Sequence, residues 1–191
     1  METAVPDNNT NHYAAIASRV WQILFVGILA VCWNAAQAAG PVGVESSAKP
    51  ATGKSVRPFV AGSLSRIVAE RQGQPFVLAF WSASCTYCPE ELKTLGEIRK
   101  ANPKLDVVLV AADTPEESPQ VAELASKYGL GKVEQWVFAG DMEERLRFDI
   151  DQRWHGELPR THFYDREHRV QVVSGSVPKA QLLAWVKANV R

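Results

Sequence analysis

From residue 59 onward, apolar positions follow two alternating patterns. Short, nearly unbroken apolar runs predict strands covered on both faces, and apolar residues spaced three or four apart predict helices. The strand-like runs lie at 75–82, 105–113 and 134–140, and the helical patterns lie at 63–73, 86–101, 116–128, 142–150 and 178–190. The segments 160–165 and 168–175 flank a short turn and predict an antiparallel hairpin. This order predicts an α/β fold with a mixed central sheet and helices on both faces.

The N-terminal part of the chain has a different pattern. Its apolar run, Val20 to Trp33, is shorter than the roughly 20 residues that cross a membrane as a helix. The tripeptide Ala36-Gln37-Ala38 fits the small-x-small rule of signal peptidase. We therefore expect 1–38 to be either a signal peptide cleaved after Ala38 or an N-terminal membrane anchor. Residues 39–58 are rich in Gly, Pro, Ser and Ala and predict a flexible linker, which leaves 59–191 as the folded domain.

Charge and cysteine content narrow the class of protein. Lys+Arg and Asp+Glu are equal at 21 each, so the basic excess of a nucleic-acid-binding protein is missing and no nucleic-acid partner is expected. The leader predicts export to the periplasm whether or not it is cleaved. A lipoprotein signal at Cys32 would also predict export, but the segment lacks the usual small residue before the cysteine. Cys32 lies in the leader, which leaves Cys85 and Cys88 as the thiols of the domain. Since exported compartments are oxidising, this pair is either a disulfide or is kept reduced by a dedicated donor.

The segment "SASCTYCPEELKTL", residues 82 to 95, carries the candidate chemistry. It places Cys85 between a buried strand and the start of a helix, where free N–H groups and the helix dipole favour negative charge. A thiolate at Cys85 would therefore attack disulfides at neutral pH. Cys88 follows one turn later and could displace the resulting mixed disulfide. Pro89 fits the first turn of a helix, where its missing N–H is not needed.

Two other interpretations of the pair are weaker. A structural disulfide across so small a ring constrains little of the unfolded chain. A zinc site needs four ligands, and the spacing of His155, His162 and His168 does not link them to the cysteines. A Cu(I) carrier is possible but lacks nearby Met or His. We therefore expect no metal and no cofactor other than the redox-active disulfide between Cys85 and Cys88.

The segment "FVLAFWSASCTYCPEELKTL" resembles the active-site strand and helix of thioredoxin-fold proteins. It is most similar to the exported TlpA and ResA type, and the resemblance covers about residues 59 to 190. It implies a thioredoxin-like fold with Cys85 as the attacking and Cys88 as the resolving cysteine. Trp81 occupies the usual position before the cysteines and is expected to pack beside them and to contribute to substrate binding.

A second motif, "GELPRTHFYD" at 156–165, fits the family pattern around a cis-proline, with Pro159 at the proline position and Thr161 and Asp165 in the surrounding pattern. The resemblance implies that Pro159 faces the cysteines and turns the backbone of Leu158 toward them. Leu158 could then hydrogen-bond an extended substrate chain. The alternative is an ordinary proline at the start of a strand.

The sequence departs from thioredoxin at two places. Thioredoxin has a buried acid on the strand before its active site, where this chain has Ala79. Glu90 and Glu91 are candidates for the missing proton transfer, although they could instead simply complement the helix N-terminus. The dipeptide Thr86-Tyr87 replaces Gly-Pro, and a tyrosine before the second cysteine resembles exported disulfide isomerases. Tyr87 is a further candidate for substrate binding.

These observations predict an extracytoplasmic thiol–disulfide oxidoreductase that reduces protein disulfides. The resemblance implies a membrane protein as electron donor, and we expect a monomer. A disulfide isomerase or oxidant of the same fold is the first alternative. The second is a non-catalytic thioredoxin-fold module that binds peptides along Leu158 and Pro159.

Overall fold

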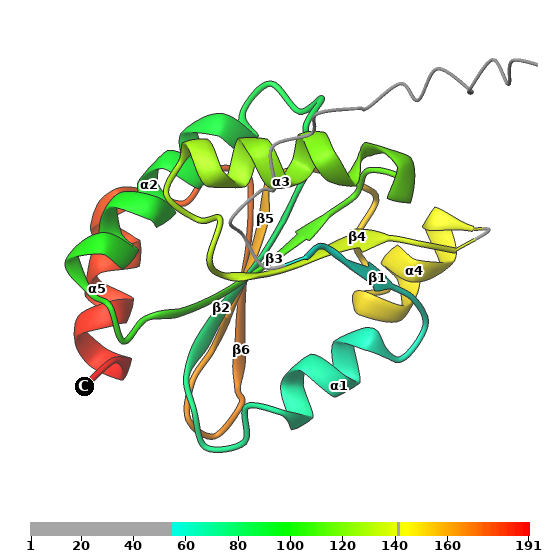
Figure 1. The fold of residues 1–191 in the computed structure, drawn as a ribbon. Helices are drawn as coiled ribbons and strands as arrows, with labels where there is room; N and C mark the ends of the chain where they lie inside the picture. Colours follow the sequence, from blue (N-terminus) through cyan, green and yellow to red (C-terminus); the bar gives the residue numbers. More distant parts are fainter. Residues whose placement is uncertain (1–54, 141) are drawn as a thin grey trace, which may run out of the picture. The chain divides into compact units, whose positions relative to one another are not determined.

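The computed structural model describes residues 55–140 and 142–191. The helices and strands of the sequence analysis are found in the predicted order (Figure 1). The strands are β1 (Arg57–Phe59), β2 (Phe76–Trp81), β3 (Asp106–Ala111), β4 (Glu134–Phe138), β5 (Arg160–Tyr164) and β6 (Val170–Ser174). The helices are α1 (Ser63–Ala69), α2 (Cys88–Ala101), the 3-10 helix η1 (Pro115–Glu117), α3 (Ser118–Lys127), α4 (Glu143–Ile150) and α5 (Lys179–Asn189).

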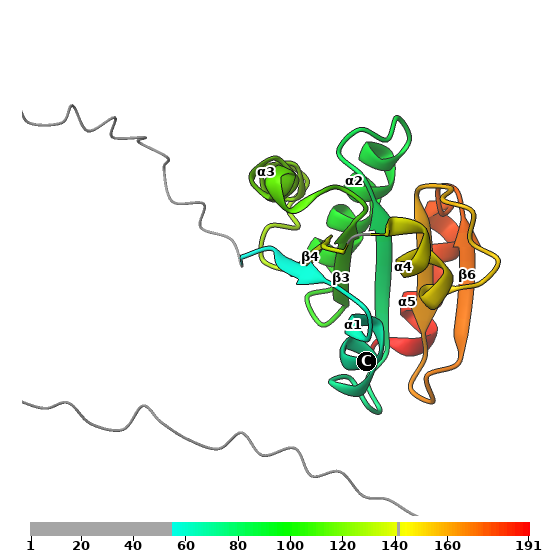
Figure 2. The same cartoon turned by 90° about the vertical axis from the view of Figure 1, so that its right-hand side faces the viewer.

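The strands form one mixed sheet in the order β1-β4-β3-β2-β5-β6, which confirms the predicted fold class. The first four strands in this order are parallel. β5 runs antiparallel to β2, and β6 runs antiparallel to β5 and so has the direction of the first four strands; Figure 2 shows the sheet from the side. β2 lies between β3 and β5 in the middle of the sheet, and all of its residues are buried. Its unbroken apolar run follows from this position, since both of its faces are covered by helices.

Alternate residues of β2 belong to two separate cores. Val77, Ala79 and Trp81 pack with apolar side chains of α2, α3 and α5. The side chains between them point to the opposite face and pack with residues of α1 and α4. Figure 1 shows the two groups of helices on opposite sides of the sheet. Cys88 belongs to the first core, so the candidate active site is built on the side of α2.

The edge strand β1 is the element that the sequence analysis missed. It begins at Arg57, so the flexible linker expected over 39–58 overlaps the folded domain at its end. Pro58 is tolerated because, among the described residues, β1 is an edge strand that pairs with β4 alone. The Arg57 guanidinium lies over the ring of Trp136, 4.0 Å from its centroid, and donates to Glu134 at 2.9 Å. These contacts attach the start of the domain to β4.

The expected signal peptide or anchor at 1–38 lies outside the described residues, as does most of the linker. Within 55–140 and 142–191, every helix is too short or too polar to cross a membrane.

Candidate active site

The two cysteines lie where β2 passes into α2. Cys85 is in the connecting loop, and Cys88 is the first residue of α2, two residues later than the predicted start of that helix. Their sulfur atoms form a disulfide, with the two Cα atoms 5.5 Å apart. The predicted pair is therefore in place at the end of the central strand.

The two sulfurs have different surroundings. Cys88 is completely buried in the core, whereas Cys85 is half-buried and packs at its margin. The backbone N–H of Cys88 donates to Cys85 Sγ at 3.2 Å. This N–H is one of the free donors at the start of α2, so it would stabilise a thiolate on Cys85 after reduction. Cys85 therefore carries the more accessible of the two sulfurs.

Asp113 holds the loop that carries Cys85, a role that the sequence analysis did not find. Its carboxylate accepts hydrogen bonds from the Ala83 backbone N–H at 3.1 Å and from the Ser82 hydroxyl at 3.0 Å. The Cys85 N–H in turn donates to the Ser82 carbonyl at 3.2 Å. Burial raises the pKa of Asp113, partly offset by these hydrogen bonds. Ser82 and Asp113 come together because they follow β2 and β3, which are neighbours in the sheet, and this adjacency is known only from the structure.

The Leu158–Pro159 peptide bond is cis, as the family pattern implied. Arg160 lies opposite Phe80 in the sheet, so Pro159 lies at the level of Trp81, where the loop to Cys85 begins. The carbonyl of Pro159 accepts the Gly175 N–H at 2.8 Å. Among the described residues, the N–H and C=O of Leu158 have no backbone partner. An extended chain could bind to this free backbone by strand addition.

The other two residues predicted to bind substrate have different positions. Tyr87 is 68% exposed beside the disulfide and is accessible to a partner chain. Trp81 is only 1% exposed and packs in the same core as Cys88. This position agrees with packing beside the cysteines and corrects the expectation of a direct substrate contact, because no substrate can reach a buried indole.

The structure distinguishes the two glutamates that were candidates for proton transfer. Glu90 is exposed, whereas Glu91 is 1% exposed although it lies in the first turn of α2. The Thr161 hydroxyl donates to Glu91 Oε1 at 3.0 Å, and the Val177 N–H donates to Glu91 Oε2 at 2.8 Å. Glu91 therefore does more than complement the helix N-terminus: it joins α2 to β5 and to the loop before α5.

Glu91 places a carboxyl group close to the position where thioredoxin has its buried acid. Thr161, which donates to Glu91, is the direct partner of Ala79 in the β2–β5 pairing. Glu91 follows Cys88 by three positions in α2, so the two side chains share one face of the helix. Glu91 of the helix is thus connected through Thr161 to the strand position next to Ala79.

Burial raises the pKa of Glu91, although the hydrogen bonds from Val177 and Thr161 oppose this effect. A raised pKa means that this carboxyl group gives up its proton at a higher pH than an exposed glutamate does. Glu91 also lines a pocket of about 290 Å³ between α2 and the start of α5.

The histidines considered as metal ligands are far from forming one site. His155 is exposed, while His168 Nε2 lies 2.8 Å from the carbonyl of Arg71. His162 is buried and accepts a hydrogen bond from Arg160, and its burial lowers its pKa to about 4. It is therefore neutral at pH 7. Among the residues that the structure describes, no three His, Cys, Asp or Glu side chains are grouped so that they could hold a metal ion.

The chain resembles a known protein family in sequence and known structures in fold. The model of the AhpC/TSA family matches residues 61–173, which is more than half of the chain. No curated protein sequence matches the chain. A secreted Mycobacterium tuberculosis disulfide oxidoreductase homologous to E. coli DsbE is similar in structure, with 25% identity and a TM-score of 0.50 over 63% of this chain and 85% of the other.

Two further solved structures have the same fold. DsbF of M. tuberculosis is 25% identical, with a TM-score of 0.50 over 62% of this chain and 83% of its own. A thioredoxin family thiol:disulfide interchange protein of Chlorobium tepidum is 20% identical, with a TM-score of 0.50 over 64% and 84%. Together with the disulfide at the start of α2, these findings show that the chain belongs to the AhpC/TSA family and is a thiol–disulfide oxidoreductase of thioredoxin fold.

Proposed function

We propose that this oxidoreductase works outside the cytoplasm and reduces disulfides of other proteins. The observation that carries the proposal is the asymmetric pair: a half-buried sulfur at the N-terminus of α2 and a buried sulfur behind it. A reductant needs such a pair, because the exposed sulfur must reach the substrate and the second must wait. Export is supported by the apolar segment and the small-x-small site at Ala36 to Ala38. The similar M. tuberculosis protein is likewise described as secreted.

The proposed reaction has two exchange steps. The Cys85 thiolate attacks one sulfur of the substrate disulfide, forms a mixed disulfide and releases the other substrate sulfur as a thiolate, which takes up a proton. Cys88 then loses its proton and attacks Cys85 Sγ, which expels the second substrate thiolate. Two electrons have passed to the substrate, and the chain holds the Cys85–Cys88 disulfide. A membrane electron donor would restore the dithiol with two electrons and two protons.

Glu91 is the proposed proton acceptor for Cys88. Both side chains are buried on one face of α2, so water has little access to the Cys88 thiol. The carboxylate of Glu91 would take the proton as Cys88 attacks and would pass it on through the pocket beside α5. The free backbone of Leu158 would meanwhile hold the substrate chain beside Cys85, with Tyr87 against its side chains.

Glu91→Gln should slow the resolving step about 100-fold, since general acid–base catalysis contributes about that much or more. The amide keeps the volume of the side chain and can still bond to Thr161 and Val177, so the fold should remain. Stopped-flow measurement of mixed-disulfide decay between pH 5 and 9 gives the rate and its pH profile. The wild-type profile should contain one ionisation that the variant lacks.

Glu90→Gln is the matched control, because Glu90 neighbours Glu91 but is exposed. It should leave the rate of decay within about twofold of wild type. Equal slowing by both substitutions, or an unchanged pH profile in Glu91→Gln, would show that Glu91 has a structural role only.

The direction of the reaction is tested by the reduction potential of the Cys85–Cys88 couple against glutathione. A reductant should lie below about −220 mV, on the thioredoxin side of the scale, whereas an oxidant or isomerase should lie nearer −120 to −180 mV. The second outcome would favour the isomerase alternative, which Tyr87 before the second cysteine supports.

Mass spectrometry of the exported protein tests the leader, since cleavage after Ala38 would give a chain beginning at Ala39.

A further inference from the structure

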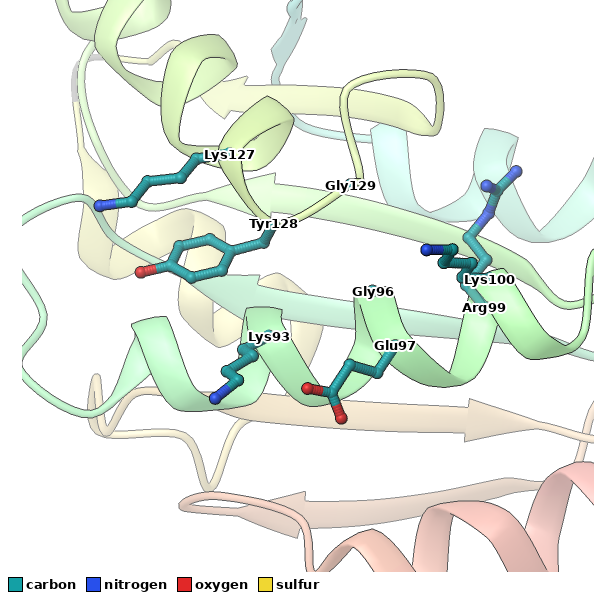
Figure 3. Close-up of a pocket in the computed structure, with 8 residues that line it drawn as sticks. All are labelled: Lys93, Gly96, Glu97, Arg99, Lys100, Lys127, Tyr128 and Gly129. Atoms are coloured by element: carbon teal, nitrogen blue, oxygen red, sulfur yellow. The ribbon is translucent and has the colours of Figure 1, made fainter.

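A cationic groove lies between α2 and the end of α3, on the face of the domain that carries the first core. It has a volume of about 490 Å³, and Figure 3 shows that its two walls come from these helices. The groove is lined by Lys93, Gly96, Glu97, Arg99, Lys100, Lys127, Tyr128 and Gly129. Its size falls within the range of small-ligand and peptide pockets.

The walls of the groove are fixed by a direct contact between the two backbones. A Cβ atom at Gly96 would lie 1.9 Å from the carbonyl oxygen of Tyr128, so α2 and the end of α3 touch at this glycine. Gly129, with φ +76°, then turns the chain away from α3. The position of the two walls is therefore set by the backbone of the fold and not only by the side chains that line the groove.

The cations of the groove form no close ion pairs with other described residues. Among the described residues, Lys93, Arg99, Lys100 and Lys127 take part in no salt bridge and donate no side-chain hydrogen bond. The Arg99 Nε atom is buried and has no hydrogen-bond partner. The single acidic side chain of the groove, Glu97, accepts from Lys179 at 2.8 Å. The hydrogen bond from Lys179 lowers the pKa of this carboxyl group, and Lys93 lies near enough to help lower it. The groove therefore has four cations and one carboxylate, and none of the four cations forms a salt bridge within the described part of the chain.

An apolar surface lies among these charges. Figure 3 shows the ring of Tyr128 lying between α3 and α2, with the Lys127 side chain running in the same direction. Lys127 Nζ is 5.9 Å from the centre of this ring. The side chain of Lys100 extends toward Gly129 on the other side of the groove (Figure 3). A ligand in the groove would thus meet the Tyr128 ring between Lys93 and Lys127 at one end and Lys100 at the other end (Figure 3).

The groove is separate from the disulfide. Lys93 and Lys100 follow Cys88 by five and twelve positions in α2, which places them about 8 and 18 Å along the helix from the cysteine. A molecule bound there would leave Cys85 and the backbone of Leu158 free. The distance between Lys93 and Lys100, about 10 Å, equals about three residues of an extended chain.

We propose that this groove binds a short acidic segment of a partner protein, with two or more carboxylates facing the lysines and an apolar group against Tyr128. The excess of four cations over one carboxylate and the length of the groove favour a peptide with several carboxylates over a single small anion. Such a site would hold a partner while its own disulfide or dithiol approaches Cys85. Binding in the groove does not depend on thiol chemistry.

The test uses fluorescein-labelled hexaglutamate and the full-length chain, with binding measured by fluorescence anisotropy at 20 and 200 mM salt. Lys93→Glu combined with Lys127→Glu should weaken binding at least tenfold, since both walls then repel the peptide. Higher salt should weaken wild-type binding as well, because exposed charges are screened. The control is Arg145→Glu combined with Lys187→Glu, which changes the net charge equally at exposed positions of α4 and α5 and should have less than a threefold effect.

Thermal melting checks that the variants fold, and Lys93→Gln with Lys127→Gln replaces the double reversal if it does not. The proposal is overturned if wild type does not bind hexaglutamate at 20 mM salt, or if both double variants weaken binding equally. It is also overturned if vesicles with phosphatidylglycerol or inorganic phosphate bind in the groove and hexaglutamate does not. Cys85→Ser should bind hexaglutamate like wild type, which separates this result from any failure of the redox function.

Discussion

Cys85→Ser should reduce insulin no faster than the background reaction without protein. The Cys85 sulfur is the more accessible member of the pair and accepts a hydrogen bond from the backbone N–H of Cys88 at the start of α2. A serine hydroxyl does not ionise near pH 7, so the substitution removes the attacking group altogether. Cys88 cannot replace it, because its side chain is completely buried. The loss should therefore be larger than for any other single substitution in the chain that leaves the fold intact.

Cys88→Ser should behave differently, because the first exchange step remains possible. A mixed disulfide with the substrate should form and persist, and it should be visible as a band of higher mass on a non-reducing gel. Each variant also carries Cys32→Ser, so that the third cysteine of the chain cannot form mixed disulfides of its own. If Cys85→Ser also captured substrate, or if Cys88→Ser did not, the assignment of attacking and resolving sulfur would have to be reversed.

Gly96→Ala should destabilise the domain by about 2 kcal/mol or more. In an exposed helix the same change would stabilise by up to about 1 kcal/mol, because alanine has the higher helix propensity. At Gly96, however, the new Cβ would lie 1.9 Å from the carbonyl oxygen of Tyr128, and a backbone atom cannot move away as a flexible side chain can. Overpacking of this kind costs about 1–3 kcal/mol or more, which outweighs the gain in propensity. Urea unfolding of wild type and variant measures the difference.

Gly140→Ala is the control, because it makes the same glycine-to-alanine change at a position where the new Cβ has room. Its added Cβ would lie 3.5 Å from Leu146 Cδ1, an ordinary van der Waals contact. We expect a change in the free energy of unfolding within about 0.5 kcal/mol, as for most surface substitutions. A similar loss for Gly96→Ala and Gly140→Ala would contradict the close approach of α2 to Tyr128.

Local pattern was sufficient to predict most of the fold. The buried strand β2 is an unbroken apolar run, and helices such as α2 have apolar residues on one face, so each element could be assigned from its own residues. β1 was missed because it has three residues, contains Pro58 and follows a segment rich in Gly and Ser. Its strand conformation depends on pairing with β4, about 80 positions later in the chain.

The same distinction applies to the site. Cys85, Cys88 and Pro159 could be predicted because each belongs to a short motif with fixed spacing. The anchoring of the Cys85 loop by Asp113 could not, because hydrogen bonds between residues 30 or more positions apart leave no periodic signal. Likewise, the sequence did not separate Glu90 from Glu91. Only the contacts of Glu91 with Thr161 and Val177, 70 and 86 positions away, show which of them is buried.

The place of β1 in the sheet has a practical consequence for protein engineering. β1 is an edge strand and is separated from β2 by β3 and β4, so the start of the domain lies about 14 Å sideways from the strand that leads to the disulfide. A fluorescent reporter, or a covalent linkage to a solid support, could be attached before Arg57 without covering the reactive sulfur. The domain could in this way be immobilised as a reusable reagent that reduces disulfides of other proteins.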